Sequence, residues 1–278
     1  MHLHLEGHGP PLVLIHGWAM HGGVFAPLLR ELSAHFECHV VDLPGHGLSE
    51  ERDGLDLDRG VDRLLAVLPS APWLGWSLGG MFALEAAVRA PDRVSALIGI
   101  AASPRFVVAP DWPHAVEHAV FEQFGADLSA DYRATIERFI ALEVHGDAHA
   151  RDEIRWLRER LAERPPSDPR ILVDGLAILA DGDLRSELPR LTVPSLWIAG
   201  QRDRLVPWQA MRDAAAMAPG GQFQRIDRAG HAPFLSHPEL VAAAIRGFMP
   251  RRNPCRDVHV APTTAGSSRA PESDAPAR

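Results

Sequence analysis

The residues of this sequence best suited to chemistry are the consecutive residues Gly75-Trp76-Ser77-Leu78-Gly79-Gly80. They form a Gly-x-Ser-x-Gly pattern directly after an apolar run and directly before an Ala- and Leu-rich stretch, which predicts a strand, a tight turn and a helix. A serine on such a turn has a strained backbone, and the flanking glycines remove the Cβ atoms that would collide across it. We therefore expect Ser77 to expose its Oγ as a nucleophile, although Gly-Ser-Gly turns without a catalytic role also occur.

A serine nucleophile needs a base, and the chain contains fifteen histidines. In enzymes built on this turn the chain order is serine, then acid, then histidine, so the base should follow the last strand. His231 fits, because it lies between the strand-like residues 222–226 and a predicted helix over residues 238–248. His237 is the alternative, but a His-Pro pair at this point is typical of the start of that helix.

The acid of such a site should follow the preceding strand, predicted over residues 195–199. Asp203 lies in the turn after it and could accept the Nδ1 proton of the histidine, which holds the base in the correct tautomer. The alternative is a structural role, in which Asp203 only caps the next helix. Asp181 and Asp183 are the other candidates, although both precede the strand.

Backbone N–H groups should stabilise the oxyanion that forms when the nucleophile attacks. The expected donors are those of Leu78, directly after the nucleophile, and Trp18, in the loop after the strand at residues 11–15. Each such donor contributes about 2.7–4 kcal/mol to transition-state stabilisation in analogous sites. We expect the Trp18 ring to form a pocket wall, and His16 and His46 to hydrogen-bond within the scaffold.

The elements that must position these residues alternate between strand and helix. Short, continuous apolar runs predict buried strands, and helical spacing of apolar residues predicts the helices between them. The predicted strands cover residues 11–15, 38–42, 73–76, 94–100 and 195–199, with helices over residues 24–35 and 81–90. This alternation is typical of a parallel sheet with crossover helices.

The alternation stops in the middle of the chain, where only helical patterning is found. The clearest predicted helices are 131–144 and 150–162, followed by a Pro-rich joint at 164–169 that must interrupt any helix. We therefore expect a core in two parts, 1–102 and 191–250, separated by a helical lid over 103–190. Residues 251–278 are rich in Pro, Ser, Thr, Ala and Arg and predict a disordered tail.

Composition narrows the classes of partner. The formal net charge is −8, and all 28 basic residues are arginine, so no basic stripe suggests a nucleic-acid partner. Cys38 and Cys255 lie far apart, and no spacing predicts a metal site or a disulfide framework. No signal peptide or membrane-spanning run is recognisable. We expect a cytoplasmic monomer that does not bind membranes.

Five motifs resemble those of the α/β-hydrolase superfamily. They are L-V-L-I-H-G-W (12–18), D-L-P-G-H-G-L-S (42–49), L-G-W-S-L-G-G (74–80), G-x-x-D-x-L-V-P (200–207) and A-G-H-A-P-F-L-S-H-P (229–238). The resemblance implies an α/β-hydrolase fold, with a mostly parallel central sheet flanked by helices and an inserted helical lid. It also implies a serine esterase with the triad Ser77, Asp203 and His231 and no metal or organic cofactor.

A narrower resemblance rests on H-G-W (16–18), G-W-S-L-G-G (75–80), T-I-E-R-F-I-A-L (135–142) and H-A-P-F-L-S-H-P (231–238). These segments are similar to BioH-type pimeloyl-[acyl-carrier protein] methyl ester esterases, which unmask the pimeloyl carboxylate on its carrier during biotin synthesis. The resemblance implies that the substrate is bound by Trp18, Ser77, Leu78, Phe139, Ile140, Ala141, Leu142, Glu143 and His231.

The same resemblance implies that arginines of the lid dock the acyl-carrier protein. Arg138, Arg151 and Arg155 match such positions, whereas Arg133 is displaced by one residue from a fourth. Independently of the family, Arg151, Arg155 and Arg158 share one helix face, and a cationic face would speed the encounter with an acidic carrier. A solvated helix face that also carries Glu153 and Glu159 is the alternative.

Other functions fit the same residues. A general short-chain carboxylesterase, a lactonase or a thioesterase would keep the machinery and change the substrate. A serine at position 77 excludes the aspartate nucleophile of dehalogenases and epoxide hydrolases. A non-catalytic ligand-binding protein of this fold is the alternative from another class. For an enzyme, we expect the rate to fall as the pH drops through about 6.5, where an unperturbed histidine titrates.

Overall fold

The computed structural model describes residues 1–50, 53–144 and 150–249. The chain divides into two units, Met1–Phe248 and Met249–Arg278. All the helices and strands named below belong to the first unit. The tail predicted over residues 251–278 lies outside the described residues.

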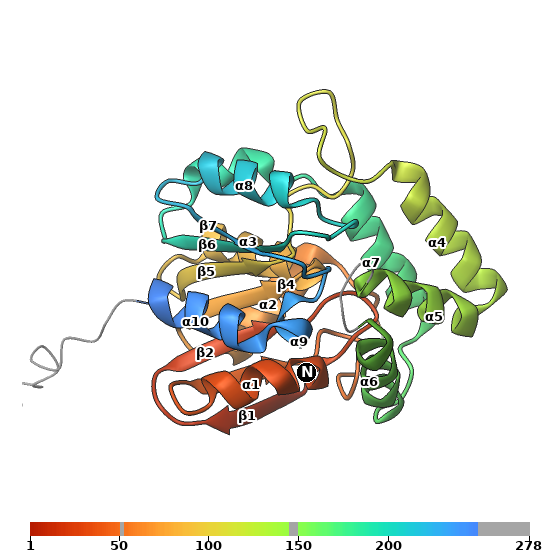
Figure 1. Ribbon diagram of the computed structural model, residues 1–278, viewed down its shortest axis with the longest axis horizontal. Helices are drawn as coiled ribbons and strands as arrows, with labels where there is room; N and C mark the ends of the chain where they lie inside the picture. Colours follow the sequence, from red (N-terminus) through yellow and green to blue (C-terminus); the bar gives the residue numbers. More distant parts are fainter. Residues whose placement is uncertain (51–52, 145–149, 250–278) are drawn as a thin grey trace, which may run out of the picture. The chain divides into compact units, whose positions relative to one another are not determined.

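A seven-stranded sheet forms the centre of Met1–Phe248 (Figure 1). Its strands are β1 (Leu3–Gly7), β2 (Pro11–Ile15), β3 (Glu37–Val41), β4 (Ala71–Trp76), β5 (Val94–Ile100), β6 (Ser195–Gly200) and β7 (Gln222–Ile226). Their spatial order is β1-β3-β2-β4-β5-β6-β7, and all neighbours run parallel except β1, which pairs antiparallel with β3. The predicted mostly parallel sheet is therefore confirmed.

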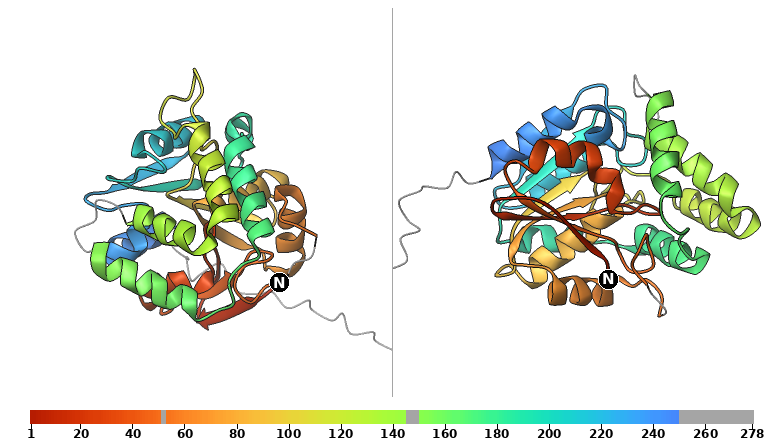
Figure 2. Two further views of the ribbon diagram at one scale, coloured as in Figure 1. Left: turned by 90° about the vertical axis from the view of Figure 1, so that its right-hand side faces the viewer. Right: turned by 90° about the horizontal axis from the view of Figure 1, so that it is seen from below.

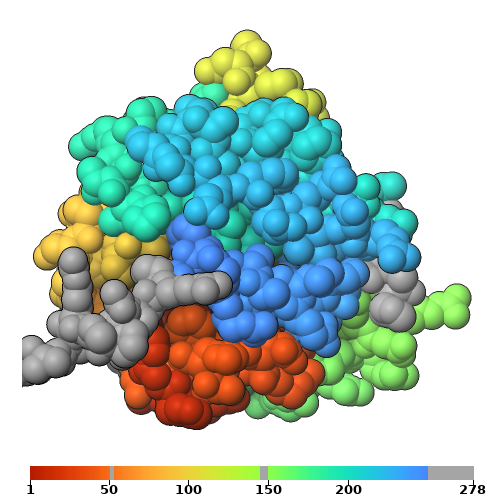
Figure 3. All heavy atoms as spheres, turned by 60° about the vertical axis from the view of Figure 1, so that its left-hand side comes forward, coloured from red at the N-terminus to blue at the C-terminus, as the bar shows by residue number. Residues whose placement is uncertain are grey.

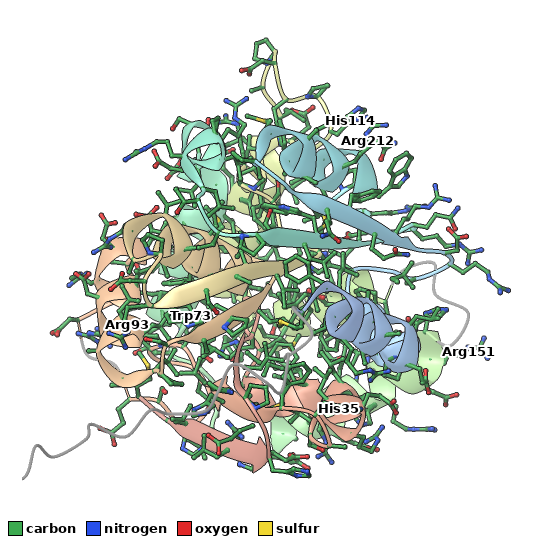
Figure 4. The ribbon with its side chains drawn as sticks, turned by 90° about the vertical axis from the view of Figure 1, so that its left-hand side faces the viewer. His35, Trp73, Arg93, His114, Arg151 and Arg212 are labelled. Atoms are coloured by element: carbon green, nitrogen blue, oxygen red, sulfur yellow. The ribbon has the colours of Figure 1, made fainter. Side chains whose placement is uncertain are left out.

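Helices cover both faces of this sheet. They are η1 (Gly22–Phe25), α1 (Ala26–Leu32), α2 (Leu57–Val67), α3 (Leu78–Arg89), η2 (Arg185–Arg190), α8 (Trp208–Met217), α9 (Pro233–Ser236) and α10 (Pro238–Phe248). Helix α1 packs against α10, and α2 packs against α3, with the two pairs on opposite faces (Figure 2). The end of this unit therefore lies beside its beginning (Figure 3). The side chain of Trp73, on β4, is fully buried in this core (Figure 4).

The chain between β5 and β6 forms a helical insertion at one end of the sheet (Figure 1). Its helices are α4 (His118–Ala130), α5 (Tyr132–Glu143), α6 (Ala150–Ala162) and α7 (Pro169–Asp181). Asp131 caps α5 by accepting from the Ala134 N–H, and Asp168 caps α7 just before Pro169, which lacks the N–H that would need a partner. The Pro-rich joint separates α6 from α7, as predicted.

Polar contacts tie the second half of the insertion to the core. The Trp18 Nε1–H donates to the Leu172 carbonyl at 2.7 Å, and Nε2 of His21 bonds the Arg160 carbonyl at 2.8 Å. The Leu55 N–H donates to Asp174 at 2.9 Å, and Arg164 pairs with the buried Asp42. These contacts reach α6, α7 and the joint between them, so this half of the insertion is anchored to the loops that follow β2 and β3.

Two neutral histidines are buried in those loops. His16 accepts from the Leu43 N–H at 2.9 Å, and Nδ1 of His46 bonds the Pro44 carbonyl at 3.1 Å, so both serve the scaffold as the sequence predicted. Burial lowers the pKa of His16 to about 3, helped by the charge of His46, and lowers the pKa of His46 to about 4. The folded protein therefore resists protonation that the unfolded chain accepts near pH 6.5.

We predict that these histidines make the folded state less stable as the pH falls. From pH 6.5 down to about 4, the unfolded chain binds protons that the folded chain excludes, so each histidine lowers the free energy of unfolding by up to about 1.4 kcal/mol per pH unit. Urea unfolding at pH 7, 6 and 5 would measure this slope. His46→Gln should remove one such contribution and reduce the slope. A His46→Gln slope equal to that of wild type would contradict the prediction.

Candidate active site

The predicted site residues follow the carboxyl ends of parallel strands. Trp18 comes after β2, Ser77 after β4, Asp203 after β6 and His231 after β7. Because parallel strands end at the same edge of a sheet, residues distant in sequence meet there. A Cβ placed on Gly17 would lie 3.1 Å from the Cβ of Ser77, so the loop that carries Trp18 packs directly against the predicted nucleophile.

Ser77 occupies the strained turn that the sequence predicts. It joins β4 directly to α3 and has φ 54° and ψ −120°, in the region that side-chain-bearing residues rarely adopt. The turn closes only because the flanking residues are glycines. A Cβ on Gly75 would lie 2.2 Å from the Gly79 carbonyl oxygen, and one on Gly79 would lie 2.4 Å from the Ile15 carbonyl oxygen.

We predict that Gly79→Ala disrupts this turn. The added methyl group must displace the backbone of β2, which should cost about 3 kcal/mol or more of folding free energy and abolish hydrolysis. Gly125→Ala is the matched control, since this helix glycine has nothing within 4 Å of an added Cβ. The control should gain up to about 1 kcal/mol, because alanine favours the helix. Urea unfolding of both variants tests the difference, and a Gly79→Ala protein of ordinary stability would contradict it.

Asp203 and His231 meet at the carboxyl ends of β6 and β7. Oδ2 of Asp203 lies 2.8 Å from Nδ1 of His231, and both side chains are buried. Oδ1 of Asp203 accepts from the N–H groups of Leu205 and Val206 at 2.8 and 2.9 Å, which fixes the carboxylate in its loop. The carbonyl of His231 accepts from Nε1 of Trp76 at 2.9 Å, which ties the histidine to the residue just before Ser77.

The far side of the His231 ring makes no hydrogen bond within the described part of the chain. Its Nε2 atom has no hydrogen-bond partner among the described residues. A contact from this atom to the Ser77 hydroxyl is what a general base would need, and such contacts are often looser before substrate binds. The geometry thus orients His231 through Asp203 and leaves Nε2 available.

A small apolar chamber, with a cavity volume of about 20 Å³, opens on Ser77. Trp18 of the core and Phe139 of α5 meet edge to face in its wall, with ring centroids 4.7 Å apart. Aromatic and aliphatic side chains of α4 and α7 complete the wall, among them Phe121, Phe124, Leu176 and Leu179. The apolar lining suits an aliphatic chain with one polar carbonyl at Ser77, but the chamber has room for little more than one water molecule and must widen to admit such a chain.

The comparisons with known proteins agree with this arrangement. The sequence matches the family model of the alpha/beta hydrolase fold over residues 10–238. It is 56% identical over 255 residues to the pimeloyl-[acyl-carrier protein] methyl ester esterase of Stenotrophomonas maltophilia (strain K279a), covering 91% of this chain and 98% of that protein. The chain belongs to the α/β-hydrolase family, and within it to the pimeloyl-[acyl-carrier protein] methyl ester esterases. The resemblance predicted from the motifs is thus confirmed.

A second relative supports the membership, and a solved structure supports the fold. The esterase of the same name from Xanthomonas campestris pv. campestris (strain B100) is 55% identical over 250 residues, 90% of this chain and 98% of that protein. The esterase EaEST from Exiguobacterium antarcticum has a TM-score of 0.81 at 22% identity and covers 88% of this chain and 94% of its own. At that identity the likeness concerns the fold, which confirms the predicted α/β-hydrolase architecture.

The family resemblance implies five residues of α5 as substrate ligands, but the structure places them in four different surroundings. Phe139 lines the chamber beside Ser77, whereas Ile140 lines a separate cavity between α5, α6 and the loop after β2. Ala141 and Leu142 line an open groove between α4 and α5, and Glu143 is buried against His231. Successive helix residues turn by about 100°, so they cannot all face one chamber.

Several chamber residues were not singled out from the sequence. They are Phe106, Val120, Phe121, Phe124, Leu176, Leu179 and Leu205. Helical spacing of Phe121 and Phe124 signals an apolar face, but only the packing of α4 against α7 shows that this face borders the nucleophile.

The predicted docking arginines lie on the surface of the insertion. Arg138 pairs with Asp127, and Arg155 lies 2.8 Å from Asp152, so these two already have carboxylate partners. Arg151 is exposed on α6 (Figure 4). Its neighbour on the predicted helix face, Arg158, pairs with Glu137 of α5.

Neither metal ligands nor a membrane segment is found in the described part of the chain. No three His, Cys, Asp or Glu side chains cluster there as ligands. No helix among residues 1–50, 53–144 and 150–249 is long and apolar enough to cross a membrane.

Proposed function

We propose that this protein is a serine carboxylesterase that hydrolyses the methyl ester of pimeloyl-[acyl-carrier protein] in biotin synthesis. The observation that carries the proposal is the 56% identity with an esterase of that name over nearly the full length of both chains. The strained Ser77, the Asp203–His231 pair and the apolar chamber supply what such a reaction needs. A general short-chain esterase, a lactonase or a thioesterase remains the alternative that the substrate test must separate.

The proposed reaction proceeds in two acyl-transfer steps. Nε2 of His231 accepts the Ser77 proton as Oγ attacks the ester carbonyl, and the N–H groups of Trp18 and Leu78 stabilise the oxyanion. His231 then protonates the departing methoxide, which leaves as methanol. Water attacks the acyl-enzyme and gives one proton to His231, Ser77 recovers that proton as the pimeloyl acid is released, and the acid then loses its own proton to solvent. Asp203 holds the imidazole in the tautomer that both steps require.

The substrate must enter with its carrier left outside. The methyl ester is at the end of the acyl chain remote from the carrier, so the aliphatic chain occupies the chamber, which widens to admit it, when the ester carbonyl reaches Ser77. In this proposal residues 103–190 act as a lid, in which Phe139 borders the acyl chain and Glu143 borders the triad. Arg138, Arg151 and Arg155 dock the acidic carrier. The carrier displaces Asp127 from Arg138 and Asp152 from Arg155. The enzyme works as a cytoplasmic monomer without a metal or organic cofactor.

The deciding experiment compares substrates. The purified protein should convert the carrier-bound pimeloyl methyl ester to the free acid, read by mass spectrometry as loss of one methylene. It should act far more slowly on lactones and on carrier thioesters, and its gene should restore growth without biotin to a host lacking this esterase. Hydrolysis of simple esters without activity on the carrier-bound ester would instead support a general esterase. No hydrolysis of any ester would support a non-catalytic ligand-binding protein.

Docking is tested separately by reversing charges on the lid. Arg151→Glu with Arg155→Glu should raise KM for the carrier-bound ester at low salt about tenfold and leave hydrolysis of a free methyl ester unchanged. Arg212→Glu is the matched control, because this exposed arginine lies on α8, away from α6 (Figure 4). Unchanged kinetics on the carrier-bound ester would remove the arginines from the proposal.

A further inference from the structure

Helix α5 brings a second carboxyl group to the imidazole of His231. Glu143 is the last residue of this helix, and its side chain is fully buried. Its Oε2 atom lies 4.0 Å from Nε2 of His231. The backbone carbonyl of Glu143 also accepts a 2.8 Å hydrogen bond from the His231 N–H. This backbone contact holds the two residues together, so the approach of their side chains is built into the fold.

The facing polar atoms of these two residues have no other partners. Both carboxyl oxygens of Glu143 and Nε2 of His231 lack a hydrogen-bond partner among the described residues. A buried polar atom without a partner is costly, and a buried unpaired charge is more so. A carboxyl group buried under these conditions, beside the imidazole of the proposed base, is a candidate for a functional role.

The imidazole of His231 therefore lies between two carboxyl groups, with Asp203 at Nδ1 and Glu143 facing Nε2. Burial lowers the pKa of His231, but the charges of Asp203 and Glu143 outweigh burial and raise it above its ordinary value. Burial raises the pKa of the Glu143 carboxyl group, against the opposing charge of the histidine. Within the described residues, these three are the charged groups that act on one another here.

We infer that Glu143 is a positioning residue that shares one proton with His231 and so sets the pH at which His231 becomes available as the base. The inference rests on the proposed triad and deepens it. With one proton on the pair, a neutral imidazole with a protonated carboxyl group exchanges with an imidazolium and a carboxylate. Only the first form can accept the Ser77 proton.

The shared proton has two consequences of opposite sign. At lower pH, the carboxylate holds the proton on His231 and reduces the fraction of enzyme with a usable base. At higher pH, the same carboxylate stabilises the imidazolium that forms when Ser77 attacks, which lowers the barrier. The acid limb of the rate profile therefore lies above pH 6.5, in place of the fall through about 6.5 predicted from an unperturbed histidine.

The test is the pH dependence of kcat/KM for a free ester, for wild type and Glu143→Gln. Glutamine keeps the shape of the side chain and removes its charge. A unit charge about 4 Å away in a partly polar interior should shift a titration by about one pH unit or more. We expect the midpoint of the acid limb to fall by about that amount and the high-pH plateau to fall about threefold to tenfold. Glu143→Asp, which keeps the charge on a shorter side chain, should restore part of both.

Glu153→Gln is the control, because Glu153 is a buried glutamate of α6 in the same insertion. It should leave the midpoint where it is in wild type. A Glu143→Gln profile that is lower at every pH by the same factor, with an unmoved midpoint, would overturn the inference and leave Glu143 a structural residue.

If the Glu143→Gln protein does not fold, a second measurement on the wild-type enzyme tests the inference. Carboxyl NMR of the wild-type enzyme should show Glu143 titrating well above its ordinary value of 4.5, and titration at or below that value would overturn the inference. Failure of the proposed function is a different result, since the wild type would then hydrolyse no ester. If only this inference fails, the wild type hydrolyses esters and its acid limb coincides with that of Glu143→Gln.

Discussion

Replacing Ser77 with alanine is expected to lower kcat by a factor on the order of 10⁶ and to leave the fold intact. Alanine has no oxygen to attack the ester, so no acyl-enzyme forms, and only the oxyanion donors and the chamber still assist water. A fluorophosphonate, which reacts with activated serines, should label the wild type once and the variant not at all. Intact-protein mass spectrometry reads the adduct directly.

The control for this experiment is another buried serine. Ser195, on β6, is fully buried and accepts a 3.2 Å hydrogen bond from Nε1 of Trp197, within the same strand. Ser195→Ala should therefore lose some stability but keep both the label and the activity. A label that persists in Ser77→Ala, or one that is absent from the wild type, would contradict the assignment of the nucleophile.

Asp203→Asn is expected to lower kcat/KM by about 10⁴ through the tautomer of His231. The amide oxygen of asparagine can keep the hydrogen bonds from the N–H groups of Leu205 and Val206, which turns its NH₂ group toward Nδ1 of His231. Nδ1 must then accept, so the ring proton moves to Nε2. A protonated Nε2 cannot accept the Ser77 proton. The pH profile of the residual rate, measured with a free ester, would report this change.

The other two candidate acids serve as controls. Asp183 pairs with Arg105 and Arg185, and Asp181 lies 3.7 Å from His118, so both are occupied away from His231. Asp181→Asn and Asp183→Asn should leave kcat/KM within about threefold of wild type, since neither is near the reacting atoms. A larger loss in either variant than in Asp203→Asn would reassign the acid.

The fold was predictable where strands are buried on both faces. The continuous apolar runs of β2, β5 and β6 are visible in the sequence because a parallel strand between two helical layers has no polar face. The edge strand β1 was not predicted. All of its residues are exposed or half-buried, so its antiparallel pairing with β3 depends on a neighbour that local patterning does not reveal.

Helices α2 and α8 were likewise not predicted from the sequence. Helix α2 is polar on average, and its few buried residues, Gly60, Val61 and Leu64, form a narrow stripe against α3. Its start is set by Asp56, which accepts from the Arg59 N–H. Such a helix owes its stability to tertiary packing more than to its own sequence.

The sequence by itself determined the turn that carries Ser77 and singled out Asp203 and His231 in the expected order. These features are local, because a strained serine needs glycines beside it and a loop after a strand needs its functional residue within a few positions. Only the tertiary structure decided which side of α5 meets the chamber and where Glu143 lies. The direction of each helical side chain depends on the rotation of that helix against the sheet, and the contact between Glu143 and His231 joins residues 88 positions apart in the chain.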